Sequence, residues 1–339
     1  MNDLTYYVGM DIHKKNVYYC VKLADGKIVN ESKVLSRRED LENWAQSLPK
    51  PWVGSMEATL FTGFVYDTIL PFCEELKVAD PVLLKAITYG KKKNDEIDAR
   101  TIADMLRADL VPECYIAPKN YRDLRDVMRF RNYLVKICTS LKNKTAGMLM
   151  QSGVQYNKTR LHGKKYFREL MGSLHDIPES IKDMARYSHS AYKLFEEVQT
   201  VLLKKISSNP LLEHRLKLLQ SIPSVGEILS LTWALEVVDP HRFSNINKVV
   251  SYAGLCSAQR ESGGKSKRGP LSKRRNKHLQ WILIEVAKMA PRHNPQLAAV
   301  YDKEVAKGNK NRATIAVARK LVAYLMAVDK SGIPFTYRS

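Results

Sequence analysis

The spacing of hydrophobic positions changes along the chain, from short strand-like runs near the N-terminus to three-and-four helical spacing farther on. Two segments, Tyr6–Ile12 and Val17–Leu23, are rich in Tyr, Val and Ile, a composition typical of β-strands. The second segment reaches Asp25-Gly26, a strong hairpin signal, before a third segment over 27–34. These segments predict a meander of three strands.

Helical and strand-like segments alternate over the next part of the chain. Helical spacing covers 41–48 and 61–76, whereas 51–56 has the pattern of a fourth strand and 78–84 is a short apolar piece. Strands followed by alternating helices predict an α/β domain that ends near residue 120.

Long amphipathic helices are predicted after Pro118. The first has apolar positions at three-and-four spacing, namely Leu124, Val127, Leu134, Cys138, Leu141 and Met148. A second stretch has the same spacing, at Ala191, Leu194, Val198, Val201 and Ile206. Two helices of one bundle and a coiled coil between subunits fit this pattern equally well. The basic, poorly periodic segment 157–166 is predicted to be a loop.

The third region contains a candidate phosphate-binding turn. A helix over 216–220, a turn over 221–227 with Pro223 and Gly226, and an apolar run to Val238 resemble a helix-hairpin-helix. Such a motif offers backbone N–H groups to phosphates at the start of its second helix. Beyond it, 261–275 is predicted to be a Gly/Lys/Arg-rich loop, and 278–289 and 312–328 are predicted helices.

The charge balance points to a polyanionic partner. The 339 residues include 55 Lys and Arg against 35 Asp and Glu, a formal net charge of +20. An excess of this size favours nucleic acid, although a merely basic or ribosome-associated protein also fits. With 45% hydrophobic and 27% charged residues, the chain has the composition of a folded protein of two or three domains.

The five cysteines are odd in number and widely spaced, without a CxxC or a zinc-like Cys/His pair. This spacing disfavours both disulfides and a structural zinc site. Because no basic leader precedes an apolar run and no apolar stretch approaches membrane-spanning length, we expect a cytoplasmic protein without a membrane partner.

Four acidic residues occupy positions from which carboxylates can converge. Asp11 ends the first predicted strand and Glu57 ends the fourth, so both can reach one edge of a sheet. Asp95 and Asp98 are three residues apart at the start of a predicted helix and can share one face. Phosphoryl transfer with two magnesium ions needs such a set of hard oxygen ligands.

Each acid also has a structural interpretation, and taken singly that interpretation is the stronger one. Asp11 could be a turn residue, Glu57 could cap the following helix, and Asp95 and Asp98 could favour a helix N-terminus. Their joint order along the chain nevertheless matches a ribonuclease-H-like layout. The residues alone leave metal binding and structural roles equally open.

The chain resembles the DEDD transposases of bacterial insertion sequences, which include bridge-RNA-guided recombinases and are related to the Piv DNA invertases. The resemblance extends over nearly the whole length and is specific because several short motifs occur in order. These motifs are Tyr7-Val8-Gly9-Met10-Asp11, Met56-Glu57-Ala58-Thr59, Asn94-Asp95-Glu96-Ile97-Asp98-Ala99-Arg100, Ile222-Pro223-Ser224-Val225-Gly226, Ser251-Tyr252-Ala253-Gly254-Leu255, Glu261-Ser262-Gly263-Gly264, Leu271-Ser272-Lys273 and Ser331-Gly332-Ile333-Pro334-Phe335.

The resemblance implies that Asp11, Glu57, Asp95 and Asp98 bind Mg²⁺, as two ions, in a RuvC-like domain, and that Ser262 is the nucleophile. In such a reaction the hydroxyl attacks a DNA phosphodiester, and a phosphoserine intermediate retains the bond energy for rejoining. The resemblance also implies double-stranded DNA substrates at the element ends and target, a noncoding guide RNA, and a homodimer or homotetramer with shared active sites.

Read without the resemblance, Ser262 lies in a segment whose glycines permit close backbone approach and whose cations can hold a phosphate. A non-catalytic phosphate-binding loop is then the better interpretation. On either interpretation the residues expected to contact nucleic acid are Lys265, Lys267, Arg268, Lys273, Arg274 and Arg275.

The sequence therefore predicts an α/β plus α protein in three parts. These are a RuvC-like DEDD catalytic domain (1–120), a helical hairpin or coiled coil for self-association (121–208), and an α-helical transposase domain that carries the helix-hairpin-helix-like motif and the serine loop (209–339). The expected function is that of a transposase or site-specific recombinase. The alternatives are a RuvC-like structure-specific endonuclease that uses water as nucleophile and a non-catalytic nucleic-acid-binding protein.

Overall fold

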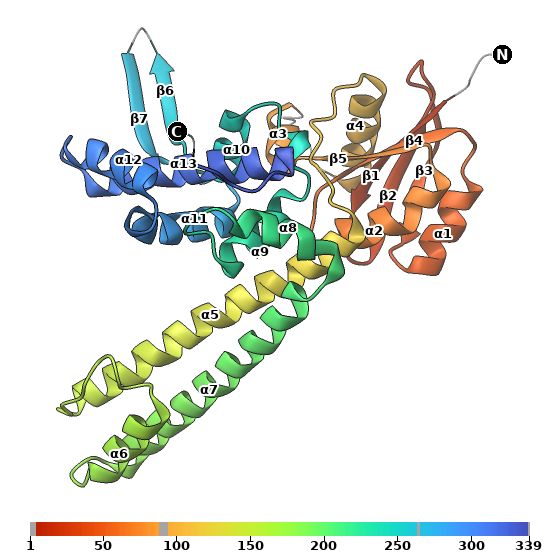
Figure 1. Ribbon diagram of the computed structural model, residues 1–339. Coiled ribbons are helices and arrows are strands. Elements are labelled where there is room, and N and C mark those ends of the chain that lie inside the picture. The colour runs from red at the N-terminus through yellow and green to blue at the C-terminus, as the bar shows by residue number, and fades with distance from the viewer. Residues whose placement is uncertain (1–4, 88–93, 263–264, 338–339) are drawn as a thin grey trace. The chain divides into compact units, whose positions relative to one another are not determined.

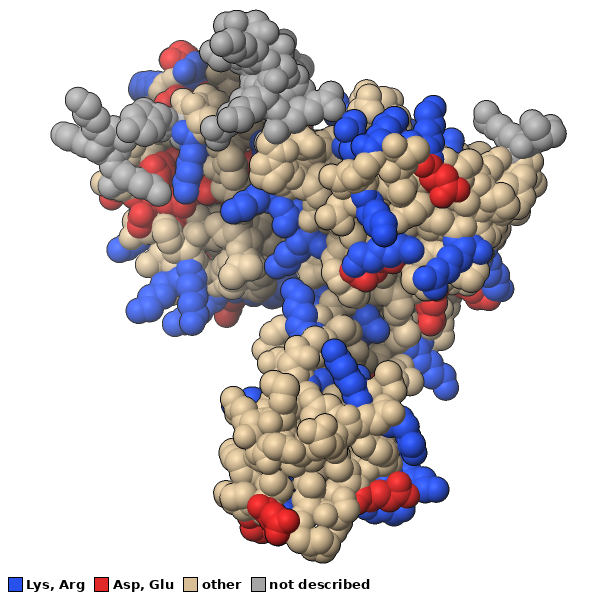
Figure 2. Space-filling view, turned by 90° about the vertical axis from the view of Figure 1, so that its left-hand side faces the viewer, with Lys and Arg blue, Asp and Glu red and all other residues tan. Residues whose placement is uncertain are grey.

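The chain folds into two compact units, residues 1–119 and 120–339 (Figure 1). The computed structural model describes residues 5–87, 94–262 and 265–337, and over 258–268 it describes the backbone at most. On the face drawn in Figure 2, Lys and Arg side chains are spread widely, whereas Asp and Glu form fewer and smaller groups. No helix in the described part of the chain combines the length and the apolarity needed to cross a bilayer.

The first unit contains a five-stranded sheet in the order β3-β2-β1-β4-β5. Strands β1, β2 and β3 are antiparallel neighbours, whereas β4 and β5 run parallel to β1, which confirms the predicted meander and the predicted fourth strand. The strands span Tyr6–Ile12 (β1), Asn16–Lys22 (β2), Ile28–Leu35 (β3), Trp52–Glu57 (β4) and Glu75–Ala79 (β5).

Side chains alternate across this sheet, and each face is covered by different helices. On one face Val8 and Met10 of β1 pack with residues of α1 (Arg38–Ser47) and α2 (Thr62–Ile69) in the core of the unit. On the other face Cys20 of β2 packs against Ala99 and Ala103 of α4 (Asp95–Arg107). The period-two pattern thus directs the intervening β1 residues, Gly9 and Asp11, towards α4.

One predicted helix, 61–76, is wrong in its second half. Helix α2 ends at Ile69, a short 3₁₀ turn covers Leu70–Phe72 (η1), and β5 follows. Pro71 explains the difference, because proline lacks the backbone N–H that would continue the hydrogen bonds of the α-helix. The predicted apolar piece 78–84 likewise divides between β5 and α3 (Pro81–Ile87).

Helix α4 lies against β1 at a point where only glycine leaves enough space. A Cβ atom added to Gly9 would be 2.2 Å from the carbonyl oxygen of Ala99 and 2.3 Å from the backbone nitrogen of Ala103. Two ion pairs hold the same helix to the sheet, Lys22 Nζ to Asp104 Oδ2 at 2.6 Å and a bidentate pair between Arg100 and Glu31.

The second unit begins with a long helical hairpin. Helix α5 (Lys119–Gln151) and helix α7 (Glu179–Ser207) run side by side in opposite directions, with α6 (Lys164–Ser173) near their far end (Figure 1). The amide of Gln199 lies 3.1 Å from the sulfur of Cys138, and Lys142 lies over the ring of Tyr192. The two predicted amphipathic helices therefore pair with each other within one chain.

The remaining helices pack into one core around α9, which is buried from Leu229 to Val237. The predicted helix, turn and helix over 216–238 are confirmed as α8, a turn and α9. The elements are α8 (Pro210–Gln220), α9 (Glu227–Val237), η2 (Pro240–Arg242), α10 (Ile246–Tyr252), α11 (Lys277–Met289), η3 (Ala290–Arg292), α12 (Pro295–Val305) and α13 (Lys310–Ser331).

The predicted loop over 261–275 and the all-helical C-terminal part need correction. The backbone instead forms an antiparallel hairpin of β6 (Ser257–Ser262) and β7 (Lys265–Leu271), with Ser262 paired to Lys265. Gly-Gly between two strand-forming segments is a signature of a tight hairpin, whereas the density of charge around it favours a loop.

A buried carboxylate joins the hairpin helix α5 to the helical core. Glu236 is 3% exposed and accepts hydrogen bonds from Arg129 Nε at 2.8 Å and Nη2 at 2.7 Å, and from Asn276 Nδ2 at 2.7 Å. Burial alone would raise the pKa of Glu236, but the hydrogen bonds and charges of Arg129, Asn276 and Arg125 outweigh it and hold the pKa below its ordinary value.

Removing one partner of this pair should be costly. We expect Arg129→Leu to lower the free energy of unfolding by about 3–5 kcal/mol, because the Glu236 charge stays buried without its main partner. Adding Glu236→Gln should recover part of the loss. Lys217→Leu, which breaks an exposed pair with Glu213, should cost less than about 1 kcal/mol in the same urea titration. Equal losses at the two sites would contradict this assignment.

A second prediction concerns the close approach at Gly9. We expect Gly9→Ala to destabilise the first unit by about 3 kcal/mol or more, because the added methyl group meets backbone atoms of α4 that cannot rotate away. Gly147→Ala is the matched control, since nothing lies within 4 Å of its added Cβ, and it should stabilise α5 by about 0.5–1 kcal/mol. Chemical denaturation measures both, and a neutral Gly9→Ala would refute the close packing.

Candidate active site at the edge of the sheet

Two of the four predicted acids lie on neighbouring parallel strands. Met10 of β1 pairs with Met56 of β4, so the next residues, Asp11 and Glu57, stand side by side as both strands run toward the same edge. Parallel strands are about 4.8 Å apart, so the two backbones bring these carboxylates into one neighbourhood. Both side chains are partly buried.

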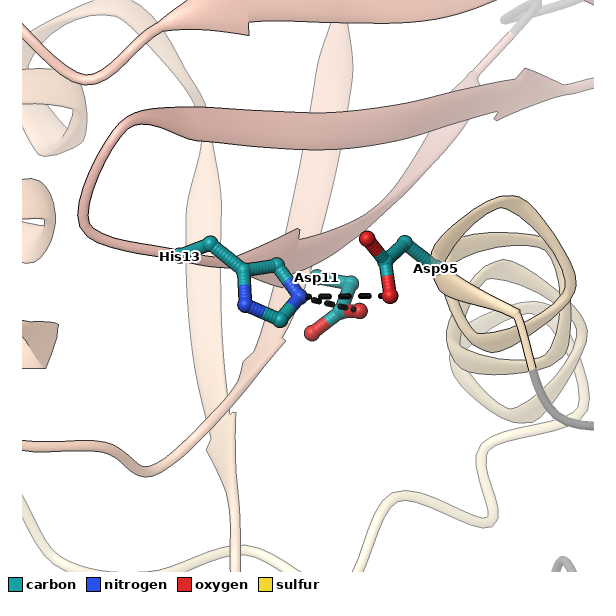
Figure 3. Close-up of side chains that lie close together, drawn as sticks. All are labelled: Asp11, His13 and Asp95. Carbon is teal, nitrogen blue, oxygen red and sulfur yellow. Dashed lines mark hydrogen bonds and ion pairs between the residues drawn. The ribbon is translucent and has the colours of Figure 1, made fainter.

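The other two predicted acids lie in the first turn of α4. Asn94 caps this helix, and its side-chain oxygen accepts hydrogen bonds from the backbone N–H groups of Glu96 at 2.6 Å and Ile97 at 3.3 Å. The cap fixes where the helix starts and so places Asp95 and Asp98 one turn apart on the same face. Because α4 packs on β1 through Gly9, its N-terminal turn brings Asp95 to the end of that strand (Figure 3).

Asp11, His13 and Asp95 form the close group of this site (Figure 3). One ligand atom from each residue lies within 4.8 Å of the others. Nε2 of His13 is 3.0 Å from Oδ2 of Asp11 and 3.5 Å from Oδ1 of Asp95, so the imidazole spans the two carboxylates. Asp11 is the most buried of the three, and His13 is half-exposed.

The carboxylates of this site repel one another. Burial raises the pKa of Asp11 above its ordinary value, and the charges of Asp95 and Asp98 raise it further, while the hydrogen bond and charge of His13 act in the opposite direction. Asp98 is therefore close enough to interact with Asp11. Carboxylates held together at this cost form a site that a divalent cation would stabilise.

The structure brings the four predicted acids to one region but not into one tight set. Asp11 and Asp95 belong to the close group, whereas Glu57 and Asp98 lie outside it among the described residues, each with contacts of its own. His13 was missed from the sequence. The sequence feature that could have identified His13 is its position two residues after Asp11, because side chains two positions apart in an extended chain point to the same side.

The predicted nucleophile lies in the other unit. Ser262 is the last residue of β6, and its side chain, like those of Lys265, Lys267 and Arg268, lies outside the described residues. The remaining predicted nucleic-acid contacts follow β7. Lys273, Arg274 and Arg275 are exposed.

Arg275 is held by local contacts that shape the base of this hairpin. Its Nη1 donates a hydrogen bond to the carbonyl oxygen of Ser272 at 2.8 Å. Its Cβ would be 2.4 Å from a Cβ on Gly254, a residue at φ +71°. Glycine at 254 is thus required both by its backbone conformation and by the side chain packed over it.

Two family models match the chain. A DEDD transposase model matches residues 8–153, which include all four acids, and the model described as "Transposase IS116/IS110/IS902 family" matches residues 216–302, which include Ser262. Together the two matched segments cover more than half of the chain.

Several transposases of insertion sequences are similar over most of their length. The transposase for insertion sequence element IS1111A of Coxiella burnetii is 26% identical over 95% of this chain and 88% of its own. The transposase for insertion sequence element IS1328 of Yersinia enterocolitica is 20% identical over 97% of this chain and 98% of its own. A putative transposase of Sinorhizobium fredii, y4qE, is 23% identical over 79% and 73%, respectively. The chain belongs to the IS116/IS110/IS902 family of DEDD transposases, enzymes that cleave and join DNA strands.

Proposed function

We propose that this transposase cleaves and rejoins DNA by attack of the Ser262 hydroxyl on a phosphodiester, assisted by divalent metal at Asp11, Glu57, Asp95 and Asp98. The observation that carries the proposal is the convergence of Asp11 and Asp95 at the edge of the sheet, inside the segment matched by the DEDD model. Two acids so far apart in sequence meet there only because α4 packs closely on β1.

The topology of the first unit supports a ribonuclease-H-like, RuvC-type domain. Three antiparallel strands followed by two parallel ones, with acids at the ends of β1 and β4 and at the start of a helix on one face, form the arrangement expected for that fold. We infer that the unit serves as the catalytic platform of the enzyme.

The donor set fits magnesium. Carboxylate oxygens are the hard ligands that Mg²⁺ prefers, and the mutual repulsion of the acids at Asp11 is the cost that a bound cation would remove. When bound, a pair of ions would supply positive charge to the attacking and leaving oxygens of the phosphodiester. The chain's own contribution is geometry, since β1, β4 and α4 hold the four carboxylates in place.

The serine step conserves the energy of the broken bond. The Oγ–P bond forms as the bond from phosphorus to one deoxyribose oxygen breaks, the serine proton leaves, and the departing oxygen takes up a proton. A second deoxyribose oxygen then displaces Ser262, so the strand is joined without an outside energy source. Water as the attacking group would lose this energy and would leave a hydrolysed strand.

We also propose that two or more copies of the chain assemble on DNA and that a noncoding guide RNA selects the sites. The charge of +20 supports simultaneous binding of several nucleic-acid strands. The RNA guide and the shared active site rest on the family resemblance and on the separation of the acids and Ser262 into different units.

Helix α7 supplies a surface for self-association. One face of it packs on α5, whereas a second stripe faces away with alternating three and four spacing, made of Met184, Tyr187, Ala191, Leu194, Val198 and Val201. Met184, Tyr187, Leu194 and Val201 are exposed in the single chain. This a/d pattern, continued over three heptads, is typical of a helix that packs on another coiled-coil helix, and a second copy of the chain is the partner we propose.

Covalent capture tests the chemistry. With Mg²⁺, duplex DNA carrying the element ends, and the element's RNA, we expect a protein–DNA adduct that resists denaturing electrophoresis. Ser262→Ala should abolish it, and Asp95→Asn should slow its formation by about a hundredfold or more, because metal assistance is worth several kcal/mol. Ser272→Ala is the control and should form adduct at the normal rate.

The outcomes separate the possible reactions. An adduct that survives Ser262→Ala would sink the serine assignment. Cleaved DNA without any adduct would favour an endonuclease that uses water, and unchanged adduct formation by Asp95→Asn would remove this residue from the reaction. Omitting the RNA tests the guide, since adduct formation at full rate without it would show an unguided recombinase.

Self-association is tested on the exposed stripe of α7. We expect Leu194→Glu combined with Val201→Glu to weaken association more than about tenfold, because each apolar side chain buried at the helix pair contributes about 1.5–3 kcal/mol. Light scattering over a concentration series measures this, with Thr200→Glu, beside the stripe, as the control. A double variant that associates like the wild type would refute this interface.

A further inference from the structure

A cavity of about 330 Å³ lies between helices α5 and α11 of the second unit. Its volume is at the lower end of the range for small-ligand sites, about 300–1,000 Å³. Four residues of α5 and three of α11 line it, namely Asn132, Val135, Lys136, Thr139, Lys277, His278 and Trp281.

One wall of this cavity carries a tryptophan, Trp281, that is exposed to solvent. Trp44, Trp52 and Trp233 are buried in the cores of the two units, whereas the Trp281 side chain is 43% exposed. It lies on a helix whose other face, including Leu279 and Leu283, is fully buried, so the core does not need the indole. An exposed aromatic ring at the wall of a cavity offers a flat apolar face to a ligand.

The polar rim of the cavity is cationic. Lys136 and Lys277 are exposed, and neither has an ion-pair partner in the described part of the chain. Burial keeps the pKa of His278 below its ordinary value, and the charges of Arg129, Lys277 and Lys136 lower it further, while Glu236 acts in the opposite direction. Glu236 is already bound to Arg129 and Asn276 and does not neutralise the lysines.

We propose that this cavity binds one unpaired nucleotide of a DNA strand, with its base stacked on Trp281 and its phosphate held by Lys136 and Lys277. Aromatic stacking together with backbone-binding cations is the combination by which proteins hold single strands. A base inside a duplex has no free face for the indole, so the site selects unstacked nucleotides. Thr139 and Asn132 add hydroxyl and amide groups to the wall.

The inference rests on the family's action on DNA and not on Ser262 or the acids. Strand exchange requires that base pairs of the original duplex open, which leaves nucleotides without partners. A cavity that holds such a nucleotide would stabilise the opened strand. Its measurement needs neither metal nor cleavage, so failure of the serine adduct would leave this inference intact.

Tryptophan emission gives a direct readout, because Trp281 is the exposed member of the four tryptophans. In metal-free buffer, a short oligothymidylate should quench the emission of the wild-type protein as it binds. Trp281→Phe should lose most of the quenching and retain most of the affinity, since a phenyl ring still stacks. Trp281→Ala should weaken binding by about tenfold, measured by anisotropy of a labelled oligomer.

The contribution of the two lysines is measured separately, from the salt dependence of binding. Lys136→Gln and Lys277→Gln should each reduce the slope of log affinity against log salt by about one, because each removes one phosphate contact. Phe130→Ala, an exposed aromatic on another face of α5, and Lys217→Gln, an exposed lysine on α8, are the matched controls and should bind the oligomer like the wild type.

Three results would overturn the proposal. The first is that Trp281→Ala binds the oligothymidylate as tightly as the wild type does. The second is that this variant loses affinity for blunt duplex DNA and for single-stranded DNA by the same factor. The third is that the wild-type protein binds an oligouridylate of the same length more tightly than the oligothymidylate. The last result would assign the cavity to RNA in place of DNA. Thermal melting of each variant shows that its fold is retained.

Discussion

The close contact between β1 and α4 at Gly9 is the constraint on which the candidate active site depends. Asp11 lies at the end of a strand and Asp95 at the start of a helix, so the distance between them is set by how closely the two backbones approach. A Cβ atom added to Gly9 would be 2.2 Å from the carbonyl oxygen of Ala99, so this position has space for a hydrogen atom and nothing larger. The pairs Lys22–Asp104 and Arg100–Glu31 also tie α4 to strands β2 and β3.

The packing that brings the acids together works against electrostatics. The pKa of Asp11 is raised by burial and by its acidic neighbours, so the folded chain holds this carboxylate in an unfavourable setting. Glu236 shows the opposite case, because Arg129 and Asn276 more than compensate for its burial and lower its pKa. Asp11 is partly buried at the edge of the sheet and Glu236 is buried in the helical core, so the neighbours of each carboxylate decide the direction in which its pKa shifts.

Local pattern was enough to predict most of the elements but not most of the contacts. The three-strand meander and the amphipathic helices could be predicted because each follows from the periodicity of its own residues. The end of α2 at Ile69 was missed although Pro71 marks it, because the helical spacing of apolar residues continues past the proline. The β6–β7 hairpin was missed although Gly263-Gly264 marks it, because the Gly, Lys and Arg content of the segment favours a loop. The proximity of Asp11 and Asp95 could be predicted only from the ordered set of family motifs, because local periodicity does not show that the end of a strand lies near the start of a distant helix.

What the sequence could not supply is the pairing of side chains from distant helices. His13 beside Asp95 depends on how α4 packs on the sheet, and Trp281 beside Lys136 depends on how α11 packs on α5. In both cases the two residues lie in different segments of the sequence, so the hydrophobic periodicity of neither segment predicts the contact. Chemistry assembled across elements is therefore visible only when the packing is known.

The buried pair of Arg129 and Glu236 and the cavity lined by Trp281 are parts of one arrangement. Arg129, Asn132 and Lys136 are three and four residues apart on α5, so they share one face of that helix. Asn276, which also binds Glu236, caps α11 and thereby sets the positions of Lys277 and His278. The ion pair thus fixes the spacing of the two helices that form the walls, and the cavity exists before any ligand arrives. A preformed site loses less conformational entropy on binding than one that must close around its ligand, which suits a pocket for a nucleotide exposed only briefly during strand exchange.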